Sequence, residues 1–158
     1  MTKGMDVAYD CYYYLGDRPC IYHKEEGAFC FCDHYRKTDR KICIIKLDAM
    51  GDVLRTTCLL PAISHHWKEA GIVWVTRKES VPLMKHNPYI VEILTYGEDT
   101  LTHWLTRRFD AVINLDAGKI SAGLASMAKA DEKHGFVLFK DGYVKGTNPA
   151  AEKWLRIG

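Results

Sequence analysis

The stretch KLDAMGDVLRT, residues 46–56, joins an apolar run to a helical pattern and decides the fold. The apolar run, residues 42–47, is nearly continuous, which is typical of a parallel strand covered on both faces. From 52 to 67 apolar residues recur at helical spacing, and Pro61 is expected to kink or break that helix. Asp52 is therefore predicted at or beside a helix N-terminus, at the carboxyl end of a buried strand.

Strand and helix patterns alternate along the rest of the chain. Apolar or β-branched runs predict further strands, at 72–76, 91–96, 111–115 and 135–138. Helical patterns fill the gaps at 79–85, 100–107, 119–129 and 150–157, the last with Asn148 and Pro149 as its cap and first helical position. This order predicts a doubly wound, mainly parallel, Rossmann-like α/β sheet with right-handed crossovers.

Composition is that of an ordinary globular domain. The chain has 158 residues, of which 47% are hydrophobic and 27% charged, and its formal net charge is +2. This balance excludes a disordered tail, and the spread of basic residues gives no footprint for nucleic acid. No apolar run approaches the ~20 residues that cross a bilayer, and the first ten residues do not resemble a secretory signal. We therefore expect no transmembrane segment and a cytoplasmic protein.

The first 39 residues differ from the remainder, because they are rich in Cys, Tyr and Gly and show no sustained period. We expect residues 1–39 to form a Cys-rich segment and residues 40–158 the Rossmann-like domain. In an intracellular protein such clustering favours a metal over disulfides. The candidate ligands of a tetrahedral structural zinc ion are Cys11, Cys20, Cys30 and Cys32, with His23 as the replacement for one of these cysteines. Iron–sulfur is less favoured because the spacing matches no ferredoxin pattern, and four reduced cysteines without a ligand are an equal alternative.

Asp52 has two interpretations. Aspartate is a common N-cap residue, and capping alone would explain its position. Alternatively, Asp52 is a general base that takes a proton from an attacking hydroxyl, with Gly51 giving a substrate room to approach. The junction lacks both the G-x-G-x-x-G fingerprint and the phosphate-binding loop, so neither NAD nor ATP is indicated.

Two segments carry a resemblance to a known family. IIKLDAMGDVLRTTCLLPAI, residues 44–63, resembles the opening strand, loop and helix of the lipopolysaccharide heptosyltransferases and their relatives, glycosyltransferase family 9. FDAVINLDAGKISAGLASMAKADEKHGF, residues 109–136, is similar to a later strand, turn, helix and strand of that family, with IVWVTRKES, residues 72–80, between the two. The resemblance covers residues 42 to about 138.

The resemblance implies a metal-independent, inverting GT-B enzyme without a catalytic cofactor. Asp52 falls on the proposed catalytic base of the family. The implied substrate-binding residues are Met50, Gly51, Arg55, Thr56, Asp116, Gly118, Lys119 and Ser121. Arg55 departs from the family, because lipopolysaccharide heptosyltransferases often have histidine there, which puts the acceptor in doubt.

The implied partners are a nucleotide-sugar donor, a saccharide or glycolipid acceptor, and a C-terminal donor domain supplied in cis or in trans. We expect this second domain to lie outside the 158 residues of this sequence. The resemblance is compatible with a peripheral position at the inner face of the membrane. The competing hypothesis is a non-catalytic, zinc-stapled module that binds a sugar or nucleotide or docks a protein, because a fold does not by itself imply a function.

Overall fold

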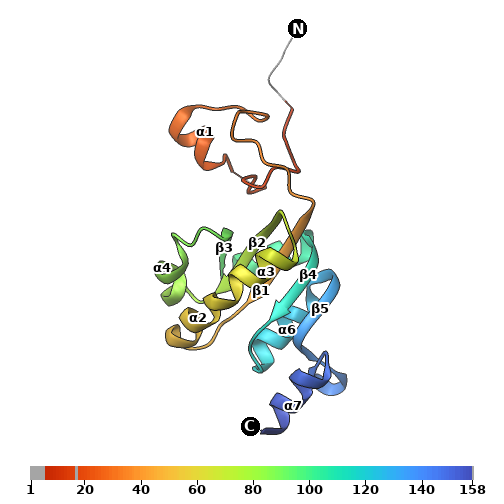
Figure 1. Ribbon diagram of the computed structural model, residues 1–158. Helices are drawn as coiled ribbons and strands as arrows, with labels where there is room; N and C mark the ends of the chain where they lie inside the picture. The colour runs from red at the N-terminus through yellow and green to blue at the C-terminus, as the bar shows by residue number, and fades with distance from the viewer. Residues whose placement is uncertain (1–5, 17, 158) are drawn as a thin grey trace.

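The computed structural model describes residues 6–16 and 18–157. Its centre is a single six-stranded sheet (Figure 1). The strands lie in the order β3-β2-β1-β4-β5-β6. The first five pair in parallel, and β6 is antiparallel to β5. Their bounds are Arg40–Ile45 (β1), Ala70–Thr76 (β2), Ile90–Thr95 (β3), Arg108–Asn114 (β4), Lys129–Leu138 (β5) and Val144–Gly146 (β6). The predicted doubly wound, mainly parallel α/β fold is confirmed.

Helices cover both faces of the sheet. They are α1 (Ile21–Glu26), α2 (Met50–Thr56), α3 (Leu60–His66), α4 (Val81–Met84), α5 (Glu98–Thr106), α6 (Lys119–Met127) and α7 (Pro149–Ile157), with short 3-10 turns η1 (Thr57–Leu59), η2 (Lys78–Ser80) and η3 (Lys140–Gly142). Along β1, Cys43 and Ile45 face a core completed by α5 and α6, while Ile44 faces a second core with α2, α3 and α4. This explains the continuous apolar run, because both faces of β1 are buried.

The predicted helix from 52 to 67 is divided, as Pro61 led us to expect. α2 begins at Met50, a 3-10 turn follows, and Pro61 lies in the first turn of α3. At this place proline costs nothing, since the first N–H groups of a helix have no partner in that helix. Asp52 is the third residue of α2, and the N-cap position belongs to Ala49. The N-cap interpretation of Asp52 is therefore wrong.

The last two strands differ from the prediction. β5 begins at Lys129, whereas the sequence predicted a helix to residue 129 and a strand only from 135. The stretch 129–134 is polar because it is only partly buried, so its pattern does not resemble that of a central strand. The short strand β6 was not predicted at all. Asn148 does cap α7, since its Oδ1 accepts the N–H of Ala151 at 2.9 Å.

The Cys-rich segment lies at the amino ends of the strands (Figure 1). Arg36 pairs with Glu69 just before β2 at 2.6 Å, and Arg107 just before β4 donates to the carbonyl of Leu15 at 3.0 Å. Among the described residues from 6 to 39, only Ala8 and Thr38 are buried. The segment therefore has almost no core of its own. No helix in the described part of the chain has the length and apolar character needed to cross a membrane.

Candidate active site at the switch point of the sheet

The strand order reverses between β1 and β4. The chain runs outward from β1 through β2 to β3, and then returns to place β4 on the other side of β1. Ligands of doubly wound sheets bind in the crevice at the carboxyl ends of such a pair of strands. The two segments that resemble family 9 begin within β1 and β4, and the loops in them that follow these strands meet at this one edge.

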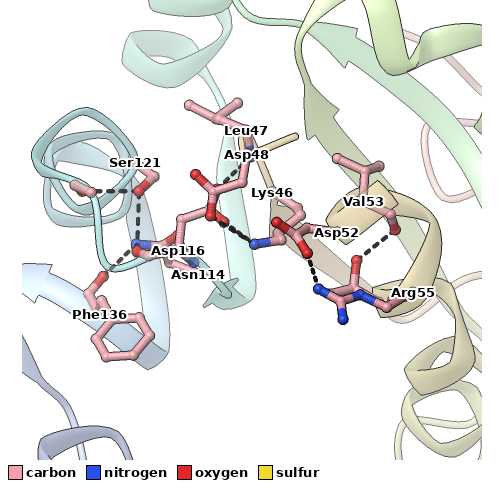
Figure 2. A network of polar contacts seen from close by, with 12 residues as sticks. Lys46, Leu47, Asp48, Asp52, Val53, Arg55, Asn114, Asp116, Ser121 and Phe136 are labelled. Atoms are coloured by element: carbon pink, nitrogen blue, oxygen red, sulfur yellow. Dashed lines mark hydrogen bonds and ion pairs between the residues drawn. The ribbon is translucent and has the colours of Figure 1, made fainter. Parts of the chain in front are cut away.

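Asp116 joins the two strand ends at this edge (Figure 2). Its Oδ1 accepts from the Lys46 ammonium group, and its Oδ2 accepts the N–H of Leu47. Lys46 also donates to Oδ2 of Asp48 at 2.9 Å. The side chains of Lys46 and Asp116 are 7% and 1% exposed, so this ion pair is buried, whereas Asp48 is 54% exposed. The network thus runs from the core to the surface.

Burial and proximity shift the ionisation of these groups. Burial raises the pKa of Asp116 to about 6, with the Asp48 carboxyl acting in the same direction and Lys46 opposing it. The hydrogen bond from Asp116 holds the pKa of Asp48 below its usual value. Burial alone would lower the pKa of Lys46, but its hydrogen bonds to Asp116 and Asp48 outweigh that effect and raise it.

Arg77, which follows β2, holds the same loop from the other side. Its Nε donates to the carbonyl of Leu47 at 2.8 Å, and its guanidinium lies 5.8 Å from the centroid of the Tyr96 ring. Arg77 and Met50 help to line an open cavity of about 430 Å³. The sequence reasoning did not single out Arg77, although a cation directly after a buried strand was a usable signal.

Asp52 lies in the first turn of α2, beside this edge (Figure 2). Its side chain is 38% exposed, and Oδ1 forms an ion pair with Arg55, whose own side chain is 81% exposed. The N–H of Asp52 bonds to the carbonyl of Ala49 at 2.8 Å. A carboxylate here is favoured by the unpaired N–H groups of the first helical turn. Asp52 is thus partly open to solvent, with one carboxylate oxygen held by Arg55.

The other residues of the predicted binding set divide into open and buried groups. Met50, Gly51, Gly118 and Lys119 are exposed. Thr56 is partly buried, and its hydroxyl donates to the carbonyl of Val53 at 2.7 Å.

Ser121 and Asp116 are the buried members of the set. The Ser121 hydroxyl has hydrogen-bond partners in the carbonyls of Asp116, at 3.1 Å, and Gly118, at 2.9 Å. The fold therefore brings the two motifs together, but it turns these two side chains inward.

The predicted zinc ligands share one cavity. Cys11, Cys20, His23, Cys30 and Cys32 all line a space of about 370 Å³ in the Cys-rich segment. The ring of His23 is hydrogen-bonded through Nδ1 to the carbonyl of Ala28 at 2.9 Å. Within residues 6–16 and 18–157, no three His, Cys, Asp or Glu side chains are grouped closely enough to hold a metal ion. The structure therefore does not show a zinc site.

The sequence and the fold of this chain were compared with those of known proteins. No family model matches the chain. Over 110 residues it is 24% identical to the lipopolysaccharide core heptosyltransferase OpsX of Haemophilus influenzae, an alignment that covers 65% of this chain and 31% of that protein. A family 9 glycosyltransferase structure from Veillonella parvula superposes with a TM-score of 0.57 and 24% identity, covering 65% of this chain and 33% of the other.

Two Escherichia coli structures agree with these. Heptosyltransferase WaaC with ADP gives a TM-score of 0.52 at 17% identity, covering 72% of this chain and 38% of that one. ADP-heptose lps heptosyltransferase II gives 0.52 at 23% identity, covering 60% and 30%. The chain thus spans about a third of the length of the relatives it matches. In sequence and in fold it is similar to part of the family 9 glycosyltransferases, and the resemblance predicted from its motifs is confirmed.

Proposed function

We propose that this chain is the acceptor-binding, base-supplying part of a heptosyltransferase-like glycosyltransferase. An acceptor hydroxyl oxygen attacks the anomeric carbon of a nucleotide-sugar, and Asp52 takes the hydroxyl proton. The bond between that carbon and the diphosphate oxygen breaks, its electron pair leaves with the nucleoside diphosphate, and the anomeric configuration inverts. The donor is bound mainly by a second GT-B domain, in cis or in trans.

The position of Asp52 is the observation that carries this proposal. An accessible carboxylate stands in a first helical turn beside the switch point of a sheet that resembles family 9 structures. A general base must reach the proton it removes, and this edge is where ligands of such sheets gather.

Two cations at this edge are candidates for binding an anionic acceptor. Arg77 lines the nearby cavity together with the carboxylates of Asp48 and Glu79, and Lys119 is exposed at the start of α6 across the same edge. Arginine and lysine at such an edge favour phosphate or carboxylate groups. We therefore propose a phosphorylated or acidic saccharide, such as a lipopolysaccharide core, as the acceptor class. ADP-heptose, the sugar nucleotide in the name of one relative, is the first donor to test.

The direct experiment is a transfer assay in which this chain is combined with a GT-B donor domain. With ADP-heptose and a lipopolysaccharide core acceptor, we expect product only when both parts are present. NMR of the new glycosidic linkage should show the configuration opposite to that of the donor. A product of retained configuration would contradict the proposal, as would an unchanged rate when this chain is left out.

We also propose that the Cys-rich segment binds structural zinc. The five predicted ligands line one cavity, and the segment has almost no apolar core to hold it in shape. A small segment of this kind gains stability when a metal cross-links it. Binding requires the cysteine side chains to turn toward a common centre. This zinc would be structural, because the segment lies at the amino ends of the strands and Asp52 lies beside the carboxyl ends.

A further inference from the structure

We propose that Asp116 and Lys46 are positioning residues, which fix the loop before α2 and thereby the place of Asp52. In this account Asp116 does not contact the acceptor, although it lies in the motif that resembles the acceptor-binding segment of family 9. The inference rests on the proposed function, because it assigns the residues that serve Asp52.

All the hydrogen-bonding groups of Asp116 are used inside the protein. Its two carboxylate oxygens accept from Lys46 and Leu47. Its N–H bonds to Oδ1 of Asn114 at 3.1 Å, and its carbonyl accepts from Nδ2 of Asn114 at 3.0 Å and from Ser121 at 3.1 Å. Since the side chain is 1% exposed, little of it faces a ligand.

A buried lysine–aspartate pair needs an explanation, because it contributes little stability. Removing two charges from water costs about as much as their attraction returns, and an apolar pair of similar volume often stabilises a fold equally well. What an apolar pair cannot supply is a directed bond between two strand ends. Here Lys46 directly follows β1, and Asp116 lies two residues after the end of β4, so the pair spans the switch point (Figure 2).

Leu47 connects the buried ion pair to the start of α2. Its N–H is held by Asp116, its carbonyl by Arg77 at 2.8 Å, and its side chain is buried in the core. Two residues later, the carbonyl of Ala49 accepts the N–H groups of Asp52 at 2.8 Å and Val53 at 3.0 Å. The first turn of α2 therefore starts directly from the held loop. Small displacements of a catalytic group cost large factors in rate.

The decisive variant is Lys46→Met/Asp116→Ala, which removes the ion pair without leaving a buried unpaired charge. Amide hydrogen exchange is followed by NMR on this chain. We expect a cooperatively folded protein in which exchange at Leu47, Asp52 and Val53 is faster by about tenfold or more. The Val75 amide should change little. A matched control, Arg108→Met/Asp131→Ala, removes an exposed ion pair between β4 and β5 and should leave the loop amides unchanged.

Kinetics with the donor domain separate positioning from substrate binding. For Lys46→Met/Asp116→Ala we expect kcat to fall about tenfold with KM little changed. Asp116→Asn tests the mechanism, because the amide oxygen still accepts the Leu47 N–H; it should keep the Leu47 amide protected. Unchanged loop exchange in the folded double variant would overturn the inference, as would a rise in KM with kcat unchanged.

Different measurements test the loop anchor formed by Asp116 and the base role of Asp52. Faster loop exchange in the double variant needs no catalysis by Asp52. Suppose that loop exchange is faster in Lys46→Met/Asp116→Ala while Asp52→Asn retains full turnover. Asp116 then anchors the loop, but Asp52 is not the catalytic base. If Asp52→Asn is inactive while the double variant has normal loop exchange and normal kcat, the positioning role falls and the base role stands.

Discussion

At the residue scale, Asp52 and Asp116 show how differently two carboxylates can be used at one edge of a sheet. Asp52 stands in a first helical turn with 38% of its side chain exposed, while Asp116 is 1% exposed and fully bonded. The sequence predicted that both lie at this edge. It could not predict which one turns inward, because that depends on Lys46 and the Leu47 N–H, which the sheet register brings against β4.

Gly51 is a residue that the fold itself does not require. It lies within α2, its φ is not positive, and a Cβ there would meet no atom within 4 Å. Gly51→Ala should therefore raise the free energy of unfolding by up to about 1 kcal/mol, measured with urea. If a substrate approaches the backbone here, KM for the acceptor should rise as well.

Gly123→Ala in α6 is the matched control for Gly51. Its Cβ would meet Leu138 at an ordinary 3.6 Å, so stability should change little or rise, and KM should stay the same. An unchanged acceptor KM in Gly51→Ala would show that the open space beside Gly51 is not used by the substrate.

The raised pKa of Asp116 predicts a pH-dependent stability. Its pKa of about 6 in the folded protein exceeds the unfolded value of about 3.9. The folded state therefore binds the proton more tightly, and the stability that this gives is present below pH 4 and is lost as the pH rises through 6. The loss is roughly 2–3 kcal/mol.

Urea unfolding of the wild type and of Asp116→Asn, at pH values from 4 to 7, measures this effect. The stability of the wild type relative to the variant should decline over that range, because the asparagine does not titrate. A difference between the two proteins that is constant, or that grows with pH, would contradict the assignment.

At the scale of secondary structure, the strands that are buried on both faces were predictable, whereas the start of β5 and the whole of β6 were not. β1 and β2 have continuous apolar runs, because helices cover both their faces. β5 begins with charged residues, and its pairing with β4 is set by neighbours distant in sequence. Local pattern alone therefore cannot place its start.

Gly135 in β5 is required by the backbone. Its φ is +93°, and a Cβ there would stand 1.9 Å from the carbonyl oxygen of Asn114. Gly135→Ala should lower the free energy of unfolding by about 3 kcal/mol or more, since backbone atoms must move. Gly142→Ala is the control, because it has a φ of +75° but open space around the Cβ. It should cost only about 1 kcal/mol; equal losses would argue against the close contact at Gly135.

The zinc hypothesis makes a prediction for the Cys-rich segment. After purification under reducing conditions with zinc present, elemental analysis should find about one zinc ion per chain, as expected for a tetrahedral site with thiolate ligands. Cys30→Ser/Cys32→Ser should lose the metal, whereas Cys58→Ser, an exposed cysteine outside the segment, should keep it. Chelation should lower the stability of the wild type and leave that of the double variant unchanged. Metal-free wild-type protein with the same unfolding midpoint would contradict a structural zinc.

At the scale of the whole molecule, the fold separates its two unusual regions. The Cys-rich segment lies at the amino ends of the strands, and the M-G-D loop lies at the carboxyl ends (Figure 1). The order of strands and helices predicted that both motifs meet at one edge, because carboxyl ends of parallel strands always share an edge. The packing of the Cys-rich segment could not be predicted, because it depends on single long-range contacts such as that of Arg36 with Glu69.

The single-turnover rate of Asp52→Asn in the presence of a donor domain tests the base role of Asp52 most directly. The amide keeps the shape of the side chain but cannot accept the hydroxyl proton as a base, so the rate should fall by about 10²–10⁴-fold. Glu98→Gln, in the first turn of α5 at the same edge of the sheet, is the matched control and should retain the wild-type rate. A wild-type rate in Asp52→Asn would contradict the central claim that this aspartate is the catalytic base.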